Sequence, residues 1–454
     1  MSMGIPVVSK NRAERMKAIA EELSRAEYEV VCLQEVWMQR DYKQISRRCS
    51  AVLPHSHYFH RYTASASDGR SSGVLGSGVC VLSKFPIEDV FFHQWPVNGY
   101  IHKIQHGDWF GGKGVGLCRI SVAGIKINVY TTHLHAEYDR ESDEYRVHRV
   151  LQAFDLSQMV RLTSVGADVV ILAGDLNTEP GDLAQRIICH NSELSDTHNV
   201  FTQAQHSEVA LRVSHSFLMS SDRMKPGSGD WAFAHQQSSV RFSEDFALDS
   251  KDQKYVLNNS NKEGATETFA HWAGFKQDLS RRIDYVLFRP GPDTQVEVVM
   301  YKQPLPEFVH QRDFSFSDHE AVMASLRITK DSSVSTGERK LDIDERITSL
   351  REGAALCDLA LLQLHRVQRS YWLCSATLFL LLLATLSYES PGLYLKMFNT
   401  VHVGLTLLLT FTVAMAGFWY TMERNGILAG KLGMEIALSR LKKERVVRRY
   451  GTVT

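Results

Sequence analysis

Four short segments, far apart in the chain, each end an apolar, strand-like run with side chains that could do chemistry. These segments are LQE at 33–35, YTTH at 130–133, LAGDLN at 172–177 and SDH at 317–319. Strand tips present side chains to a common cleft, so we expect the four segments to converge. The GDLN segment is the strongest signal of a functional site, because Asp175 and Asn177 follow a continuous apolar run of the kind that forms a buried strand. Buried polar groups need partners, and a metal ion or a phosphate is a natural one.

The elements that must position these tips are short β-rich runs separated by long loops, over residues 1–328. Alternating strands flank Ala123-Gly124, which predicts a hairpin. Apolar residues at helical spacing predict one helix around residues 16–23 and another over about 142–164. Many short strands with a few helices favour a β-sandwich that carries its helices outside.

The composition changes after residue 328. Residues 329–345 are polar and charged and predict a linker, and leucines at helical spacing predict a juxtamembrane helix over 346–369. Within 370–422, two uncharged apolar stretches, about 371–388 and 400–421, are long enough to cross a bilayer. Residues 423–454 form a basic tail. Arginines and lysines lie on both outer flanks, which places these flanks and the main domain in the cytosol, joined by a short lumenal hairpin.

The bulk composition excludes several classes of protein. The formal net charge is zero, so the chain has no overall basic field of the kind that nucleic-acid binders often carry. The seven cysteines are scattered and never form a CxxC pair, which argues against a disulfide framework and a zinc knuckle. The N-terminus has no apolar stretch of signal-peptide length. We therefore expect a reducing compartment and no nucleic-acid partner.

The chemistry-bearing segments together resemble the endonuclease/exonuclease/phosphatase superfamily, the fold of DNase I. The resemblance rests on LQE (33–35), THL (132–134), GDLN (174–177), RIDY (282–285) and SDH (317–319), which occur in the family's order over about 320 residues. It implies a four-layered α/β/β/α sandwich over residues 1–328, followed here by the two membrane helices. It also implies hydrolysis of a phosphodiester with Mg²⁺ as the cofactor, since such chemistry needs a metal to neutralise phosphoryl oxygens.

The resemblance also assigns roles at these positions. Glu35 would ligate Mg²⁺ through a hard carboxylate oxygen. Asp175 and Asn177 would orient the attacking water and the phosphoryl oxygens. His319 is implied as the general base, with Asp284 fixing its imidazole.

Two further site residues follow from the same pattern. His133 would donate to the phosphoryl oxygens, and Asp318 would support the metal site or the leaving group. A structural alternative exists for Asp284, namely a strand carboxylate paired with Arg281 or Arg282.

A narrower resemblance points to the neutral sphingomyelinases of the mammalian type, whose catalytic domain precedes two membrane helices. It rests on THLHAEYDRESDEYRVHRVLQ (132–152), NGYIHKIQHGDWFGGKGVGL (98–117) and the paired spans. It implies that sphingomyelin is cleaved to ceramide and phosphocholine. His135 would line the cleft or be a loop polar group. Lys113 would lie near the substrate phosphate, with Asp108 pairing to it in one state. A P-loop interpretation of 107–113 fails, because Gly114 stands where Ser or Thr is needed.

The sequence departs from the family at its start, where Met1-Ser-Met-Gly-Ile-Pro replaces a strand that ends in asparagine. We expect the neighbouring strands to have unpaired edges, in a truncated or alternative product or a chain with an upstream start. The alternatives for function are another phosphodiesterase or phosphatase of the superfamily, such as a nuclease, and a membrane-tethered pseudoenzyme. Residues 203–264 are expected as substrate-facing loops. The expected location is the endoplasmic reticulum or another internal or nuclear membrane; protein partners are not indicated.

Overall fold

The structure is a computed structural model that describes residues 10–60, 76–207, 281–330, 342–386, 392 and 395–450. Parts of the chain that the sequence analysis singled out lie largely outside these ranges: the first residues, the region 203–264 and the linker 329–345. The described ranges contain every residue expected to take part in chemistry.

A six-stranded sheet forms the centre of the domain. Its strands are, in spatial order, β4 (Ile87–Gln94), β5 (Gly114–Val122), β6 (Ile125–His133), β7 (Val169–Asp175), β9 (Asp284–Pro290) and β8 (Ser195–Asp196). The predicted hairpin joins β5 to β6. At its turn Ala123 and Gly124 both have positive φ, 49° and 80°, which matches the twist of a tight hairpin. The second half of β6 is buried throughout, because other layers cover both faces of the sheet.

A second β layer lies against one face of this sheet and consists of two separate small sheets. One contains β1 (Val30–Leu33), β3 (Cys80–Ser83) and β2 (His55–Tyr58), and the other contains β10 (Thr294–Lys302) and β11 (Met323–Lys330). Apolar side chains from both layers, among them Val129, Ile171 and Ile328, form one cluster and line the space between them. This layer brings β1 and the loop before β11 to the same end of the main sheet as the tips of β6 and β7.

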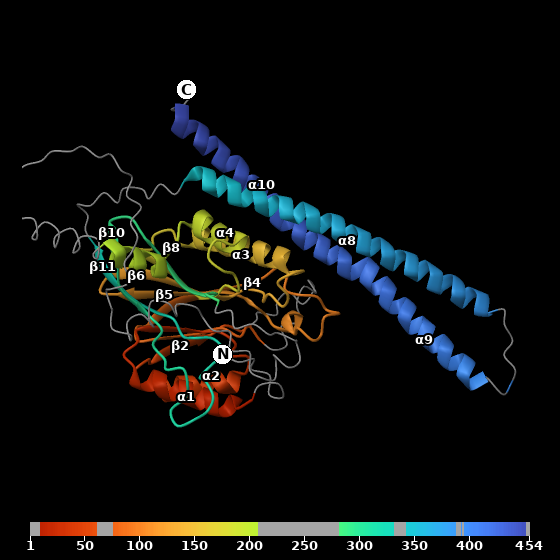
Figure 1. Ribbon diagram of the computed structural model, residues 1–454, viewed down its shortest axis with the longest axis horizontal. Coiled ribbons are helices and arrows are strands. Elements are labelled where there is room, and N and C mark those ends of the chain that lie inside the picture. Colours follow the sequence, from red (N-terminus) through yellow and green to blue (C-terminus); the bar gives the residue numbers. More distant parts are fainter. Residues whose placement is uncertain are drawn as a thin grey trace, which may run out of the picture.

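Helices cover the two outer faces and complete the predicted four layers (Figure 1). Helices α1 (Arg12–Arg25) and α2 (Gln39–Cys49) pack on the small sheets through Met16, Ile19 and Ile45. On the opposite side, α3 (Arg146–Thr163) and α4 (Leu183–Ser192) pack on the main sheet. The α/β/β/α sandwich expected from the sequence is confirmed.

Two long C-terminal helices form an additional layer outside α3 and α4 (Figure 1). They are α8 (Ile343–Leu386) and α10 (Tyr420–Tyr450). Buried residues of both helices, including Leu350, Ile427 and Met434, belong to the same apolar core as α3 and α4. The composition of the sequence predicts a juxtamembrane helix, a first span and a basic tail as separate segments. In the structure, the first two are one uninterrupted helix, because a change from polar to apolar side chains does not interrupt backbone hydrogen bonding.

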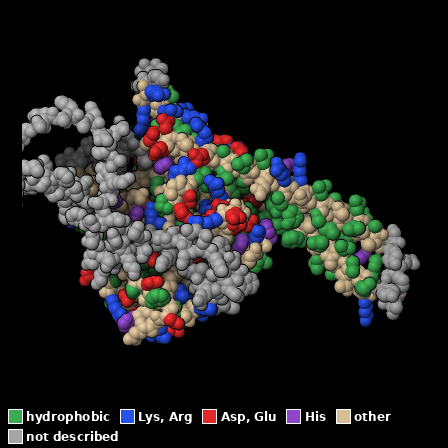
Figure 2. All heavy atoms as spheres, viewed as in Figure 1, with side chains coloured by type: hydrophobic (Ala, Val, Ile, Leu, Met, Phe, Trp, Pro, Cys, Tyr) green, Lys and Arg blue, Asp and Glu red, His purple; other side chains and the backbone are tan. Residues whose placement is uncertain are grey.

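The middle of this helical region extends away from the domain as an apolar hairpin. It contains the second half of α8, then α9 (Leu395–Ala414) and a π-helical turn, η4 (Met415–Trp419), that leads into α10. Large apolar side chains such as Leu373, Leu380 and Leu407 are mostly exposed here. Figure 2 shows many hydrophobic and few charged side chains along this projecting part of the molecule. Among the residues that the structure describes, two helices are therefore long and apolar enough to cross a membrane.

Candidate active site

The register of the main sheet places three chemistry-bearing side chains in one row. The parallel pairing of β6 with β7 sets His133 beside Asp175, and the antiparallel pairing of β7 with β9 sets Asp175 beside Asp284. His133 Nε2 lies 3.3 Å from an oxygen of Asp175. Three of the predicted site residues thus converge because their strands are neighbours, although Asp284 is more than a hundred residues further along the chain.

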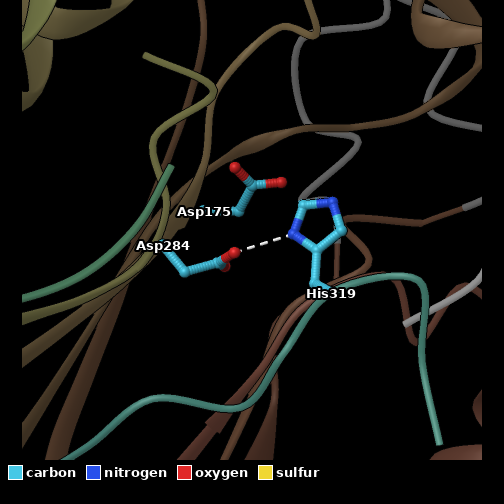
Figure 3. A group of neighbouring side chains, drawn as sticks. All are labelled: Asp175, Asp284 and His319. Atoms are coloured by element: carbon cyan, nitrogen blue, oxygen red, sulfur yellow. Dashed lines mark hydrogen bonds and ion pairs between the residues drawn. The ribbon is translucent and has the colours of Figure 1, made fainter. Parts of the chain in front are cut away.

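His319 completes this group from the loop before β11. Its Nδ1 donates to Asp284 Oδ2 at 2.7 Å, which leaves Nε2 on the far side of the ring (Figure 3). Burial lowers the pKa of His319, but the surrounding carboxylates, Asp284 foremost, outweigh burial and raise the pKa to about 10. The pairing of Asp284 with His319 agrees with the role implied by the family pattern.

Asp175 and Asn177 form a compact turn after β7. Asp175 Oδ1 accepts from the backbone N–H of Asn177 at 2.8 Å, and Asn177 has a φ of 45°, which is uncommon for a residue with a side chain. The amide of Asn177 also donates to the carbonyl of Leu134 at 3.0 Å. Burial, together with the nearby carboxylate of Asp284, raises the pKa of Asp175 to about 7.

Glu35 follows the end of β1 on the opposite β layer. Its φ of 62° turns the chain sharply at this point. Its Oε2 is buried and has no hydrogen-bond partner among the described residues, and burial raises the pKa of the carboxyl to about 7. A buried carboxylate oxygen without a partner is costly unless something else satisfies it, and a hard cation would do so.

A cavity of about 720 Å³ unites the group. Its polar end is lined by Glu35, Asp175, Asp284, Asp318 and His319. Its longer apolar part runs between β1 and β11, past Val129, Ile171 and Ile328. Among the described residues, β1 pairs with β3 and β11 pairs with β10, and both β1 and β11 border this cavity. One cavity therefore combines titratable groups with an apolar wall.

Lys113, Asp108 and His135 form a second, fully buried cluster next to the first. Lys113 Nζ lies 2.7 Å from Asp108 Oδ1, and Asp108 Oδ2 lies 3.5 Å from His135 Nε2. Lys113 also donates to the carbonyl of Leu134 at 3.2 Å, the same carbonyl that accepts from Asn177. These three side chains are at most 6 % exposed, and they stand behind the cavity rather than among the residues that line it.

His133 connects the two clusters electrostatically. It is 2 % exposed, and burial, reinforced by the positive charge of Lys113, lowers its pKa well below the usual value. Its imidazole is therefore neutral at physiological pH and can act as a hydrogen-bond donor or acceptor without a fixed charge.

Three residues of this environment were not identified from the sequence. Tyr138 donates to the Asp108 carboxylate, Asn98 holds the backbone of the loop that carries Asp108, and His148 contacts the same loop from α3. All three lie within the stretches that carry the narrower family resemblance, but no spacing rule marks them. Their roles depend on contacts between residues 10 to 50 positions apart.

A family model described as the endonuclease/exonuclease/phosphatase family matches residues 7–319, which contain the whole site. The chain belongs to this family. It is 34% identical to a Drosophila melanogaster protein assigned by name to the neutral sphingomyelinases, over 97% of this chain and 96% of that protein. It is also 34% identical to sphingomyelin phosphodiesterase 2 of Mus musculus, over 71% of this chain and 63% of that protein.

A third relative has a different name. The chain is 29% identical to the inositol phosphosphingolipids phospholipase C of Schizosaccharomyces pombe, over 72% of this chain and 66% of that protein. The first two relatives confirm the resemblance to neutral sphingomyelinases. The name of the third refers to sphingolipids with a different head group, inositol phosphate.

Proposed function

We propose that this membrane-associated enzyme hydrolyses sphingomyelin to ceramide and phosphocholine with Mg²⁺ as its cofactor, and so acts in sphingolipid metabolism. The observation that carries the proposal is the shared cavity, in which Glu35, Asp175, Asp284 and His319 meet beside an apolar wall. A phosphodiester at the polar end and an aliphatic chain along the wall match a phospholipid substrate. The names of the relatives support the lipid class.

The residues present fit a hard divalent cation. Glu35 offers a buried oxygen without a partner, and Asp175, Asp284 and His319 offer ligand atoms within 4.8 Å of one another. Nδ1 of His319 is already bound to Asp284, so Glu35 and Asp175 are the better ligands, with Asp318 supporting them from the same end of the cavity. When bound, Mg²⁺ supplies positive charge to the phosphoryl oxygens and acidifies a coordinated water.

The chain's own residues supply the proton transfers and the orientation. His319, held by Asp284, accepts the proton of the attacking water at Nε2 when its ring is neutral, a form that a nearby divalent cation would favour by lowering the pKa that the surrounding carboxylates raise. Asp175 and Asn177 orient that water and the phosphoryl group, and neutral His133 donates to a phosphoryl oxygen. Lys113, held by Asp108 in the state observed here, would stabilise developing negative charge from behind the cavity, and the neutral ring of His135 packs beside Asp108.

The membrane topology belongs to the same proposal. The hairpin of α8 and α9 spans the bilayer twice, and the basic residues that flank it keep the catalytic domain in the cytosol. The endoplasmic reticulum or another internal or nuclear membrane is the proposed location. Substrate is then drawn from the cytosolic leaflet to which the domain is tethered.

A second candidate is hydrolysis of the same bond in a sphingolipid with an inositol phosphate head group, which the Schizosaccharomyces pombe relative favours. The site residues above act on the phosphate and not on the head group, so their geometry is compatible with both substrates. A nuclease is disfavoured, because a formal net charge of zero offers no basic groove for a polyanion.

The test uses the purified full-length protein in detergent micelles. Sphingomyelin, an inositol phosphosphingolipid and a DNA duplex are offered separately, with Mg²⁺ or with chelator. Mg²⁺-dependent release of phosphocholine from sphingomyelin that His319→Ala abolishes supports the proposal, and His310→Ala, which changes an exposed histidine of the same loop, is the matched control. Turnover of the inositol lipid alone supports the second candidate. Retained liposome binding without any turnover would identify a pseudoenzyme.

A further inference from the structure

A buried pair of side chains connects the C-terminal helical region to the active-site environment. His148 of α3 is 0 % exposed and Glu423 of α10 is 6 % exposed, and His148 Nε2 lies 2.5 Å from Glu423 Oε1. Glu423 lies four residues beyond the π-helical turn that ends the second apolar segment. The mechanism proposed above does not use this pair, although burying a carboxylate is costly unless it serves a specific contact.

The hydrogen bonds of His148 define its tautomer. The backbone N–H of Gly99 donates to His148 Nδ1 at 3.2 Å, so Nδ1 must be the acceptor and carry no proton. The proton of a neutral imidazole is then on Nε2, where it is donated to Glu423. The carboxylate of Glu423 therefore fixes the ring in the one tautomer that can hold Gly99.

Gly99 begins a chain of contacts that ends at Lys113. We name residues 96–113 the Asp108 loop. Asn98, beside Gly99, donates to the carbonyls of Asp108 at 2.7 Å and of Gly111 at 3.0 Å. Asp108 in turn holds Lys113 at 2.7 Å. Gly99 has a φ of 77°, and a Cβ there would lie 3.0 Å from His135 Nε2, so the backbone at this point is closely fitted against the cluster.

A second contact joins the same two parts of the molecule. Trp419 of η4 packs edge-on against Trp109 of the Asp108 loop, with ring centroids 6.2 Å apart. Small residues let α10 approach closely: a Cβ at Gly426 would lie 2.8 Å from Val97, and one at Gly430 would lie 2.2 Å from Leu151. The contact with Glu423 is therefore part of a close-packed interface and is not an isolated surface ion pair.

We propose that Glu423 is a positioning residue for catalysis: through the Nε2–H of His148, it holds the Asp108 loop in the conformation that keeps Asp108 and Lys113 beside the reaction site. The helix that follows the second membrane segment thereby sets the geometry of the active site. This inference rests on the proposed function for its kinetic test, but not for its structural test.

The first experiment compares Glu423→Leu, which removes the hydrogen-bond acceptor, with Glu423→Gln, which keeps one. Glu435→Leu on the exposed face of α10 is the matched control. In the full-length protein in sphingomyelin mixed micelles, Glu423→Leu is expected to lower kcat about tenfold with little change in KM, the effect of one lost charged hydrogen bond. Glu423→Gln and Glu435→Leu are expected to stay within about twofold of the unmodified protein.

Hydrogen–deuterium exchange of the Asp108 loop gives a readout that needs no activity. Exchange in the loop is expected to rise about tenfold in Glu423→Leu and not in Glu423→Gln. The double variant Glu423→Leu/His148→Phe leaves no buried charge without its partner and takes the acceptor only from the N–H of Gly99, so it remains a test if the single variant fails to fold. It is expected to melt closer to the unmodified protein than Glu423→Leu does and still to show the faster exchange and lower kcat.

Unchanged exchange and unchanged kcat in Glu423→Leu or in the double variant would overturn the inference. Equal impairment of Glu423→Gln and Glu423→Leu would also overturn it, because an acceptor would then not be the cause. If the unmodified protein does not cleave sphingomyelin, the proposed function fails, and exchange alone decides the positioning role.

Discussion

At the scale of single residues, the site is defined by carboxyl groups whose pKa values burial has displaced toward neutrality. Burial raises the pKa of Glu35 and of Asp175 to about 7 each, whereas the neighbouring carboxylates raise that of His319 to about 10. Without a cation, the site therefore holds protons that a bound cation would have to displace. The binding of a cation to the site therefore depends on which of these buried groups carry a proton.

Because protonated carboxyl groups do not bind Mg²⁺, the affinity for Mg²⁺ should rise between about pH 6 and about pH 8 as Glu35 and Asp175 lose their protons. Isothermal titration calorimetry in two buffers of different ionisation enthalpy measures both the affinity and the protons released. Glu35→Gln should weaken binding and reduce proton release, and Glu297→Gln on the exposed face of β10 should change neither. An affinity independent of pH would contradict this assignment.

His319 and Asp284 should be unequal in their contributions to turnover. His319→Asn removes the proton acceptor and is expected to lower kcat by about 10²–10⁴-fold. Asp284→Asn keeps a hydrogen-bond partner for Nδ1 but removes the charge, so a smaller loss is expected, with a shifted pH profile. Rates measured across pH for both variants distinguish the roles. A larger loss of kcat in Asp284→Asn than in His319→Asn would show that His319 is not the general base.

At the scale of elements, the register of the sheet decides which side chains meet. Gly174 precedes Asp175 in β7, and a Cβ at this position would lie 2.2 Å from the backbone oxygen of Thr132 on β6. Any side chain there must push the two strands apart. The close approach of β6 and β7 is what brings His133 within 3.3 Å of Asp175.

Gly174→Ala is therefore expected to destabilise the protein by about 1–3 kcal/mol and to lower activity beyond the loss of folded protein. Gly404→Ala in α9 is the matched control, since a Cβ there meets no atom within 4 Å. Thermal melts and specific activity per folded molecule measure the two effects. A Gly174→Ala protein with unaltered stability would show that the two strands can separate without cost.

At the scale of the whole molecule, the C-terminal helices are both a membrane anchor and part of the core. Leu350 of α8 and Met434 of α10 are fully buried against the helices of the catalytic domain. The apolar hairpin itself is exposed. Its two helices meet at Ser375 and Thr412, whose hydroxyl oxygens lie 2.9 Å apart.

A chain that ends at residue 330 should consequently be less stable than the full-length protein, with a melting midpoint lower by more than about 5 °C and greater binding of a hydrophobic dye. A chain in which a short glycine–serine linker replaces residues 376–411 should keep most of its stability, because the described side chains that are removed, apart from the buried Leu378, are exposed or half-buried. Equal melting midpoints for the full-length protein and the chain ending at 330 would contradict the shared core.

The sequence by itself determined the kind of chemistry, the fold family and the two apolar segments. Glu35, Asp175, Asn177 and His319 each lie at the end of a strand or in the adjoining loop. Local patterns of this kind can be recognised in the sequence without knowledge of how the strands pack. The hairpin turn at Ala123-Gly124 was likewise predictable, because a tight turn depends only on its own backbone angles.

Only the tertiary structure decided which distant residues touch. The burial of His135, the hydrogen bond of His148 to Glu423 over 275 positions, and the packing of α10 on α3 leave no periodic trace in the sequence. Such contacts arise from the shapes of packed elements, and many sequences share the same local pattern without making them. The division of the C-terminal region into helix, span and tail followed composition, whereas the folded chain follows continuous backbone hydrogen bonding and the apolar face available on α3 and α4.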